Sequence, residues 1–94
     1  MERVVLNGAR MATREKAHAH IRKRFRFPDY YGCNLDALHD CLTDVSVPTE
    51  ILLRNSRPMQ AKLGDYATKL LSVLAASTGE NPRLSLTVRQ GFFR

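Results

Sequence analysis

Apolar positions follow two different periods along the chain, which predicts strands separated by helices. Short apolar runs near residues 3–7 and 50–54, and an apolar and polar alternation over 84–88, are typical of β-strands. Between them, apolar residues recur three and four positions apart, as on one face of a helix. Strands joined through helices imply right-handed crossovers and a parallel sheet. We therefore expect an α/β fold in which a three-stranded parallel sheet packs with about four helices.

The expected helices begin and end at residues with suitable capping chemistry. Thr13, Asn34 and Asp65 can each accept a hydrogen bond from the first turn of a helix, and Gly64 and Gly79 are the expected ends of the third and fourth helices. The first helix should end near Arg26, and Pro58 suits the first turn of the third. The expected apolar faces are Ala17, Ile21 and Phe25, then Leu35, Leu38, Cys41 and Leu42, and finally Ala67, Leu70, Leu71 and Leu74.

Length and composition indicate one soluble globular domain over residues 1–94. A chain of 94 residues supports one hydrophobic core, and 44% hydrophobic with 26% charged residues is too apolar for a disordered tail. No apolar run approaches the roughly 20 residues of a membrane span, and the first residues lack a signal-peptide pattern. We expect a cytoplasmic protein with reduced cysteines, in which Cys41 is a core residue.

The charge is distributed unevenly. The chain carries 15 Lys and Arg against nine Asp and Glu, a formal net charge of +6, which by itself suggests a nucleic acid or an acidic partner. However, residues 27–47 contain four carboxylates and no Lys or Arg, so a segment of charge −4 lies within a remainder of charge +10. An acidic segment of this kind suits a cationic partner.

The candidates for chemistry are few, so we expect no enzyme activity, no metal and no cofactor. His18 and His20 are two residues apart on a predicted helix, so they point away from each other and are expected to be solvated. There is no glycine-rich phosphate loop and no hydrolase or metalloprotease motif. Two features stay open: the basic run at 22–26, which either contacts RNA or caps its helix, and Phe92-Phe93, which either folds back onto the sheet or contacts a partner.

The second predicted helix carries polar residues opposite its apolar side. Asp36, His39, Asp40 and Thr43 cluster there at 100° per residue, after a loop that contains Tyr30 and Tyr31. Like charges four residues apart cost a few tenths of a kcal/mol in an isolated helix. The pair is either a solvated surface or, with the neighbouring tyrosines, a binding surface, since rigid aromatic residues bury area at small entropic cost.

A resemblance favours the binding surface. The segment FPDYYGCNLDALHDCLT, residues 27–43, closely resembles the loop and second helix of the barstar family, which are bacterial ribonuclease inhibitors. The likeness also covers the opening strand, the first helix and the strand after Pro48, and is weaker in the closing helix and strand. The chain departs from the family at His39 and Val45, where the family has tryptophan, and near Ala76, where it has an acidic residue; Glu80 follows one turn later.

The resemblance implies a protein that inserts its loop and second helix into a ribonuclease active site and performs no reaction. It implies interface roles for Tyr30, Asn34, Asp36, Asp40 and Thr43, with Asp40 at the centre, and we extend this expected partner-binding set to Tyr31, His39 and Asp44. The expected partner is a ribonuclease with a basic active site, neutral or acidic overall, bound by a monomer without membrane contact. The alternatives are an immunity protein against a toxin ribonuclease and a small basic nucleic-acid-binding domain, although its acidic segment would repel phosphate.

Overall fold

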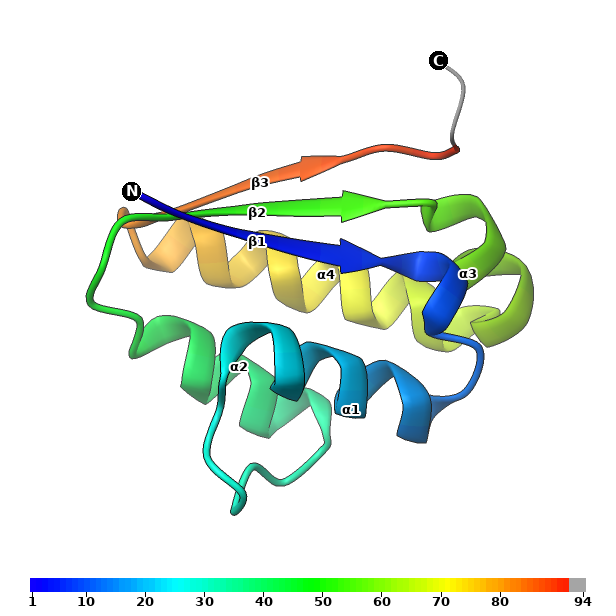
Figure 1. Cartoon of the computed structure of the whole chain (residues 1–94), viewed down its shortest axis with the longest axis horizontal. Helices are drawn as coiled ribbons and strands as arrows, with labels where there is room; N and C mark the ends of the chain where they lie inside the picture. The colour runs from blue at the N-terminus through cyan, green and yellow to red at the C-terminus, as the bar shows by residue number, and fades with distance from the viewer. Residues whose placement is uncertain (92–94) are drawn as a thin grey trace.

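The computed structural model describes residues 1–91, and the Phe92-Phe93 pair lies outside them. Three parallel strands, β1 (Glu2–Asn7), β2 (Thr49–Arg54) and β3 (Leu84–Val88), form one sheet in the order β1-β2-β3 (Figure 1). The register aligns Val4 with Ile51 and Ile51 with Leu86. The expected parallel sheet and its three strand positions are confirmed.

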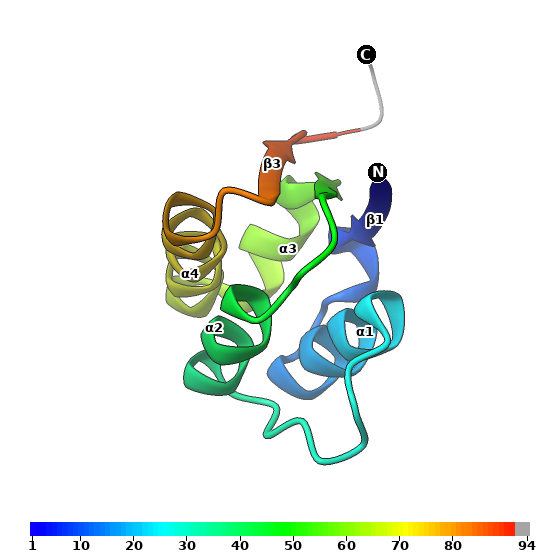
Figure 2. The same cartoon turned by 90° about the vertical axis from the view of Figure 1, so that its left-hand side faces the viewer.

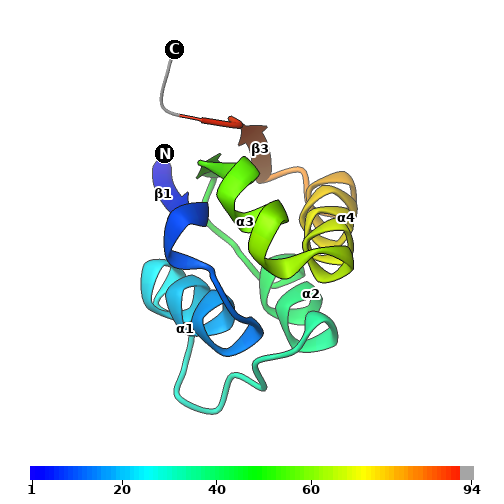
Figure 3. The same cartoon turned by 90° about the vertical axis from the view of Figure 1, so that its right-hand side faces the viewer.

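The helices are η1 (Gly8–Arg10), α1 (Arg14–Phe25), α2 (Leu35–Thr43), α3 (Ser56–Leu63) and α4 (Asp65–Glu80). Figures 1 and 2 show α1, α2 and α4 on one side of the sheet, and Figure 3 shows α3 at the end of the sheet where β1 and β2 finish. The hydrophobic core lies between these layers, and its largest side chains include Leu6, Ile51, Leu53, Leu38 and Leu74.

Two of the expected helix ends are wrong. Asp65 is not the N-cap of α4: Gly64, with a φ of 57°, occupies that position, and Asp65 is the first helical residue. Gly79 does not stop the helix, which continues to Glu80. The helix ends there because Asn81 precedes Pro82, and the residue before a proline is driven into extended backbone. Thr13 and Asn34 do cap α1 and α2, through hydrogen bonds of 3.1 and 2.7 Å to the amides of Lys16 and Ala37.

The apolar alternation of β3 is only partly buried. Leu84 is buried and Leu86 half-buried, but Val88 is 42% exposed. The strand therefore has one inward face that opens to solvent near its end, where the alternation predicted burial throughout.

The two α1 histidines are not solvated, which corrects the expectation from their spacing. They do point apart, but His18 is 1% exposed and faces the core, whereas His20 accepts a hydrogen bond of 2.9 Å from the backbone N–H of Asn7. Arg24, also on α1, donates at 3.0 Å to the backbone carbonyl of Val5. Because β1 is an edge strand, these two side chains partner backbone groups that no neighbouring strand reaches.

The Asn7-Gly8 turn that follows β1 packs directly onto the chain that follows β2. A β-carbon on Gly8 would lie 2.2 Å from the backbone oxygen of Asn55, so only glycine fits there without displacement. Asn55 itself has a φ of 56° and donates from its side chain to Asn7 at 2.8 Å. This contact fixes the ends of β1 and β2 relative to each other.

Among residues 1–91, no helix is both long enough and apolar enough to cross a membrane.

Candidate functional site

Four exposed carboxylates lie along α2 and at the end of α4. Asp36 and Asp40 are one turn apart on α2, Asp44 is its C-cap, and Glu80 is the last residue of α4. We call these four residues the acidic surface. Across residues 1–91, no Lys or Arg forms an ion pair with any of them, whereas Asp29 in the preceding loop is paired with Arg22 at 3.1 Å. The carboxylates are therefore available to a cationic partner.

His39 connects the two helices of the acidic surface. Its Nε2 lies 3.0 and 3.1 Å from the two carboxylate oxygens of Glu80, and its Nδ1 lies 3.8 Å from Asp40. The hydrogen bond to Glu80 raises the pKa of His39 above its ordinary value of 6.5, and the negative charges of Glu80 and Asp40 act in the same direction, against a smaller opposing effect of burial. Glu80, one turn after Ala76 in the sequence, is thus brought next to the polar side of α2.

Both ends of α2 are held by asparagine side chains. Asn34 caps its N-terminus and also donates at 3.2 Å to the carbonyl of Gly32. Asn81, only 5% exposed, donates from Nδ2 to the carbonyls of Leu42 and Val45 at 3.0 and 2.9 Å. The carbonyl of Leu42 also accepts from the backbone N–H of Val45 at 3.2 Å, so Asn81 adds a second donor there and supplies one to the carbonyl of Val45 beyond the helix end, where α2 has no basic residue in its last turn. Nothing in the sequence pattern indicates this role, because it depends on α4 ending next to the C-terminus of α2.

The loop before α2 is fixed by a buried chain of three polar rings. Tyr31 Oη lies 2.7 Å from His18 Nδ1, and His18 Nε2 lies 2.6 Å from Tyr66 Oη, which links the loop to α1 and α4. Burial lowers the pKa of His18 and raises that of Tyr31, so the imidazole is held neutral and the phenol keeps its proton. A neutral imidazole has one donor and one acceptor nitrogen, so one tyrosine donates to the ring and the other accepts from it.

The two adjacent tyrosines of this loop have opposite environments. Tyr30 is 87% exposed, whereas Tyr31 is 6% exposed and packs against Phe27, which in turn stacks on Phe25 with centroids 4.9 Å apart. The ring of Tyr30 is thus open to solvent, whereas the ring of Tyr31 packs beneath the loop. Both tyrosines belong to the expected partner-binding set, but only the ring of Tyr30 is exposed.

The remaining expected residues also have structural contacts. The hydroxyl of Thr43 donates to the backbone carbonyls of His39 and Asp40 at 3.0 and 3.1 Å, so its proton is used within α2. Cys41 packs against the core from the other side of the helix, and burial, with Asp44 and Asp40 nearby, raises the pKa of its thiol. A raised pKa keeps the thiol protonated near neutral pH, and the half-buried Cys41 packs against the core as expected.

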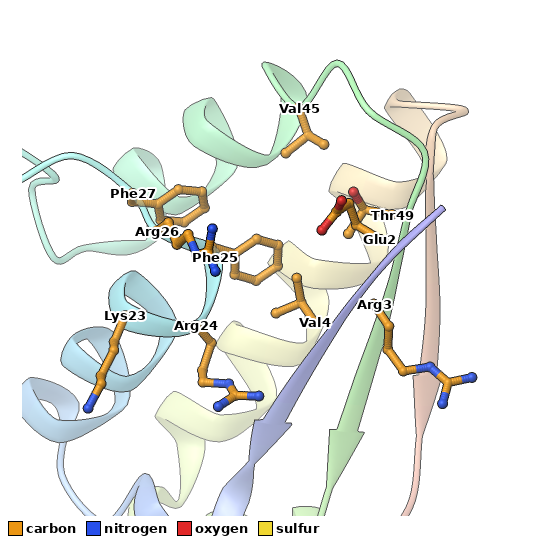
Figure 4. A pocket seen from close by; sticks show the side chains of 10 residues that line it. All are labelled: Glu2, Arg3, Val4, Lys23, Arg24, Phe25, Arg26, Phe27, Val45 and Thr49. Atoms are coloured by element: carbon orange, nitrogen blue, oxygen red, sulfur yellow. The ribbon is translucent and has the colours of Figure 1, made fainter.

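The basic run at the end of α1 does not form a converging cationic site. Of its members, Arg22 pairs with Asp29 and Arg24 binds the carbonyl of Val5. A hollow of about 410 Å³ lies beside this run, lined also by Phe25, Val45 and Thr49. Figure 4 shows Lys23 and Arg3 far apart on opposite sides of the view, each with its charged end directed away from the other lining residues. These side chains do not gather around one phosphate position.

The described residues also contain no group of three or more His, Cys, Asp or Glu placed to hold a metal ion. The acidic surface itself consists of exposed carboxylates from two helices, with the exposed ring of Tyr30 in the loop that precedes α2.

Comparison with known proteins settles the relationship. Residues 1–89 match the model of a protein family described as "Barstar (barnase inhibitor)". The chain belongs to the barstar family. A protein of Bacillus subtilis (strain 168) with the printed name "Putative ribonuclease inhibitor YrdF" is 37% identical to it over 81 residues, which are 85% of this chain and 89% of that protein. Family membership and this relative support a ribonuclease-inhibitor role.

Proposed function

We propose that this barstar-family protein inhibits a bacterial ribonuclease by inserting α2 and the preceding loop into the enzyme's active site. The observation that carries the proposal is the acidic surface: its carboxylates are exposed and lack Lys or Arg partners among residues 1–91. Three of them belong to α2, whose two ends are held by Asn34 and Asn81, and the fourth, Glu80, ends α4. A ribonuclease cleft binds phosphates through cationic side chains. Carboxylates held on a rigid helix can take the phosphate positions and present no bond to cleave.

Asp40 is the proposed centre of the contact. Its side chain is 82% exposed, and it lies between Asp36, one turn before it, and the His39–Glu80 pair. Tyr30 offers an exposed aromatic ring in the loop before α2, and Asn34, Thr43 and the backbone around Tyr31 complete the proposed surface. The inhibitor acts by occupancy, so no step of its action needs a catalytic group or a cofactor.

We further propose that the target has a basic active site in a neutral or acidic surface. Outside residues 27–47 this chain carries +10, which would repel a uniformly basic enzyme during encounter. Opposite net charges, by contrast, would bring the acidic surface to the cleft. The same argument holds for a self-made ribonuclease and for the toxin of a competitor.

The test is inhibition of RNA hydrolysis by purified ribonucleases: first barnase, which the family description names, then enzymes with neutral or acidic surfaces. The protein should suppress hydrolysis at equimolar concentration with at least one of them. Asp40→Ala should weaken binding by at least ~2 kcal/mol, the scale of an interface hot spot, because cations in the cleft lose their partner. Glu2→Ala, an exposed carboxylate on β1, is the matched control and should bind as the parent does. If the folded protein inhibits none of these enzymes, or if Asp40→Ala inhibits as well as Glu2→Ala, the proposal is wrong.

A further inference from the structure

Among residues 1–91, His39 is the only side chain within the acidic surface that can gain a positive charge by binding a proton. It makes two short contacts with Glu80 across the helix interface and a longer one with Asp40 on its own helix. The side chains of His39, Asp40 and Glu80 are 36%, 82% and 56% exposed, so water and a partner both reach them. A proton can therefore enter and leave this site without unfolding the protein.

We infer that His39 is a proton-controlled specificity residue, which tunes how strongly the acidic surface binds a cationic ribonuclease cleft. With a neutral imidazole, the surface presents four carboxylates. With a protonated imidazole, a positive charge stands between Asp40 and Glu80, and the surface competes less well for a partner's cations. This inference rests on the proposed function and deepens it.

The geometry determines the direction of the effect. From α4, the charged group facing His39 is Glu80, and from its own helix it is Asp40; both favour the imidazolium. Carboxylates only accept hydrogen bonds, so Nε2 must carry a proton toward Glu80, and protonation adds a second donor toward Asp40. The positive charge of a partner bound to the same carboxylates offsets the negative charges that favour the imidazolium. Binding should therefore lower the pKa of His39.

Reciprocity then makes binding depend on pH. If the partner lowers the pKa of His39, protons must weaken the partner's binding by the same factor. For one group, this amounts to at most about tenfold in affinity per pH unit over the range between the free and bound pKa values. The partner's own groups titrate too, so the informative quantity is the difference between the parent and a variant that lacks the imidazole.

The first measurement is an NMR titration of the His39 ring in the free protein. Glu80→Gln should lower the pKa of His39, whereas Glu2→Gln, which removes a carboxylate of β1, should leave it unchanged. If the Glu80→Gln and Glu2→Gln proteins titrate alike at His39, the contact does not act as inferred, and the inference is overturned whatever the protein binds.

The second measurement is a dissociation constant between pH 5.5 and 8, for the parent and for His39→Gln. The enzyme is the first of the ribonuclease panel above, starting with barnase, that the parent inhibits. The ratio of the two constants should change by about threefold to tenfold over this range, with the parent losing more affinity at acidic pH. Parallel pH profiles would refute the role of His39 while leaving the inhibitor assignment intact. Absence of binding by both proteins, at every pH, to barnase and to every other enzyme of the panel would refute the proposed function itself, and this inference with it.

Discussion

Removing one oxygen from the buried Tyr31–His18–Tyr66 chain should destabilise the protein far more than removing the same oxygen one residue earlier. Tyr31→Phe keeps the ring and its packing on Phe27 but deletes the hydroxyl that lies 2.7 Å from His18 Nδ1. His18 is 1% exposed, so water cannot replace the lost partner. A buried polar atom left without a partner costs about 1–3 kcal/mol.

That cost is a substantial part of the total stability. Domains of this size unfold with roughly 5–15 kcal/mol, and 1 kcal/mol corresponds to about 4–8 °C in Tm for 60–100 residues. A loss of about 2 kcal/mol should thus lower Tm by roughly 8–16 °C. Tyr30→Phe is the matched control: its ring is 87% exposed, and its effect should stay within about 0.5 kcal/mol.

Urea unfolding and calorimetry of the parent, Tyr31→Phe, Tyr66→Phe and the double variant provide the assay. Because both tyrosines bind the same imidazole, the two single effects should not add. Equal stability of Tyr30→Phe and Tyr31→Phe would refute the reasoning, since it would mean that the His18 nitrogen finds another partner or was never held by the phenol.

Four further results are expected. Gly8→Ala should destabilise the folded protein by at least ~2 kcal/mol, because the added β-carbon would meet the backbone of Asn55. Gly79→Ala, in open space within α4, should stabilise it by about 0.5–1 kcal/mol. Similar unfolding midpoints for the two variants would contradict this. Asn81→Asp replaces the amide donor at the end of α2 by a carboxylate that faces backbone carbonyls. It should lower the free energy of unfolding, measured by chemical denaturation, by about 2 kcal/mol or more. An unchanged free energy of unfolding would contradict the capping role of Asn81. Between pH 7 and 5 the free energy of unfolding should fall, by up to about 1.4 kcal/mol per pH unit for each group, because His18 and His20 have pKa values below 6.5 in the folded protein and the unfolded chain therefore binds more protons. The pKa of His39 is raised in the folded protein, so His39 opposes this fall. His39→Gln should make the fall steeper in urea unfolding measured across this pH range, and a shallower fall would contradict the reasoning. Added salt should slow association with the target ribonuclease in stopped-flow experiments, because opposite net charges are screened over about 8–10 Å, and a faster rate at high salt would refute the inferred charge of the target.

The order of strands and helices could be predicted from the sequence because it depends on local periodicity. The three- and four-residue spacing of apolar side chains can be recognised without knowing which surface the helix packs against. The same is true of the capping chemistry of Thr13 and Asn34. The acidic segment was also visible, since a stretch without Lys or Arg is a property of the chain alone. Gly79 was misassigned because a glycine can lie inside a helix or end it, and only the extended Asn81 before Pro82 decided the end.

Tertiary structure decided which polar residues face water. Tyr30 and Tyr31 are identical neighbours in sequence, yet one is exposed and the other lies against His18, because the path of the loop over α1 turns successive side chains to opposite sides. The same holds for the histidines of α1, whose partners come from β1, the loop and α4. Glu80 reaches His39, 41 residues away in sequence, only because α4 packs on α2. The sequence by itself thus determined the helices and strands and the sign of the site's charge. Contacts between distant elements determined which side chains form the site, because burial and hydrogen-bond partners exist only once the elements pack.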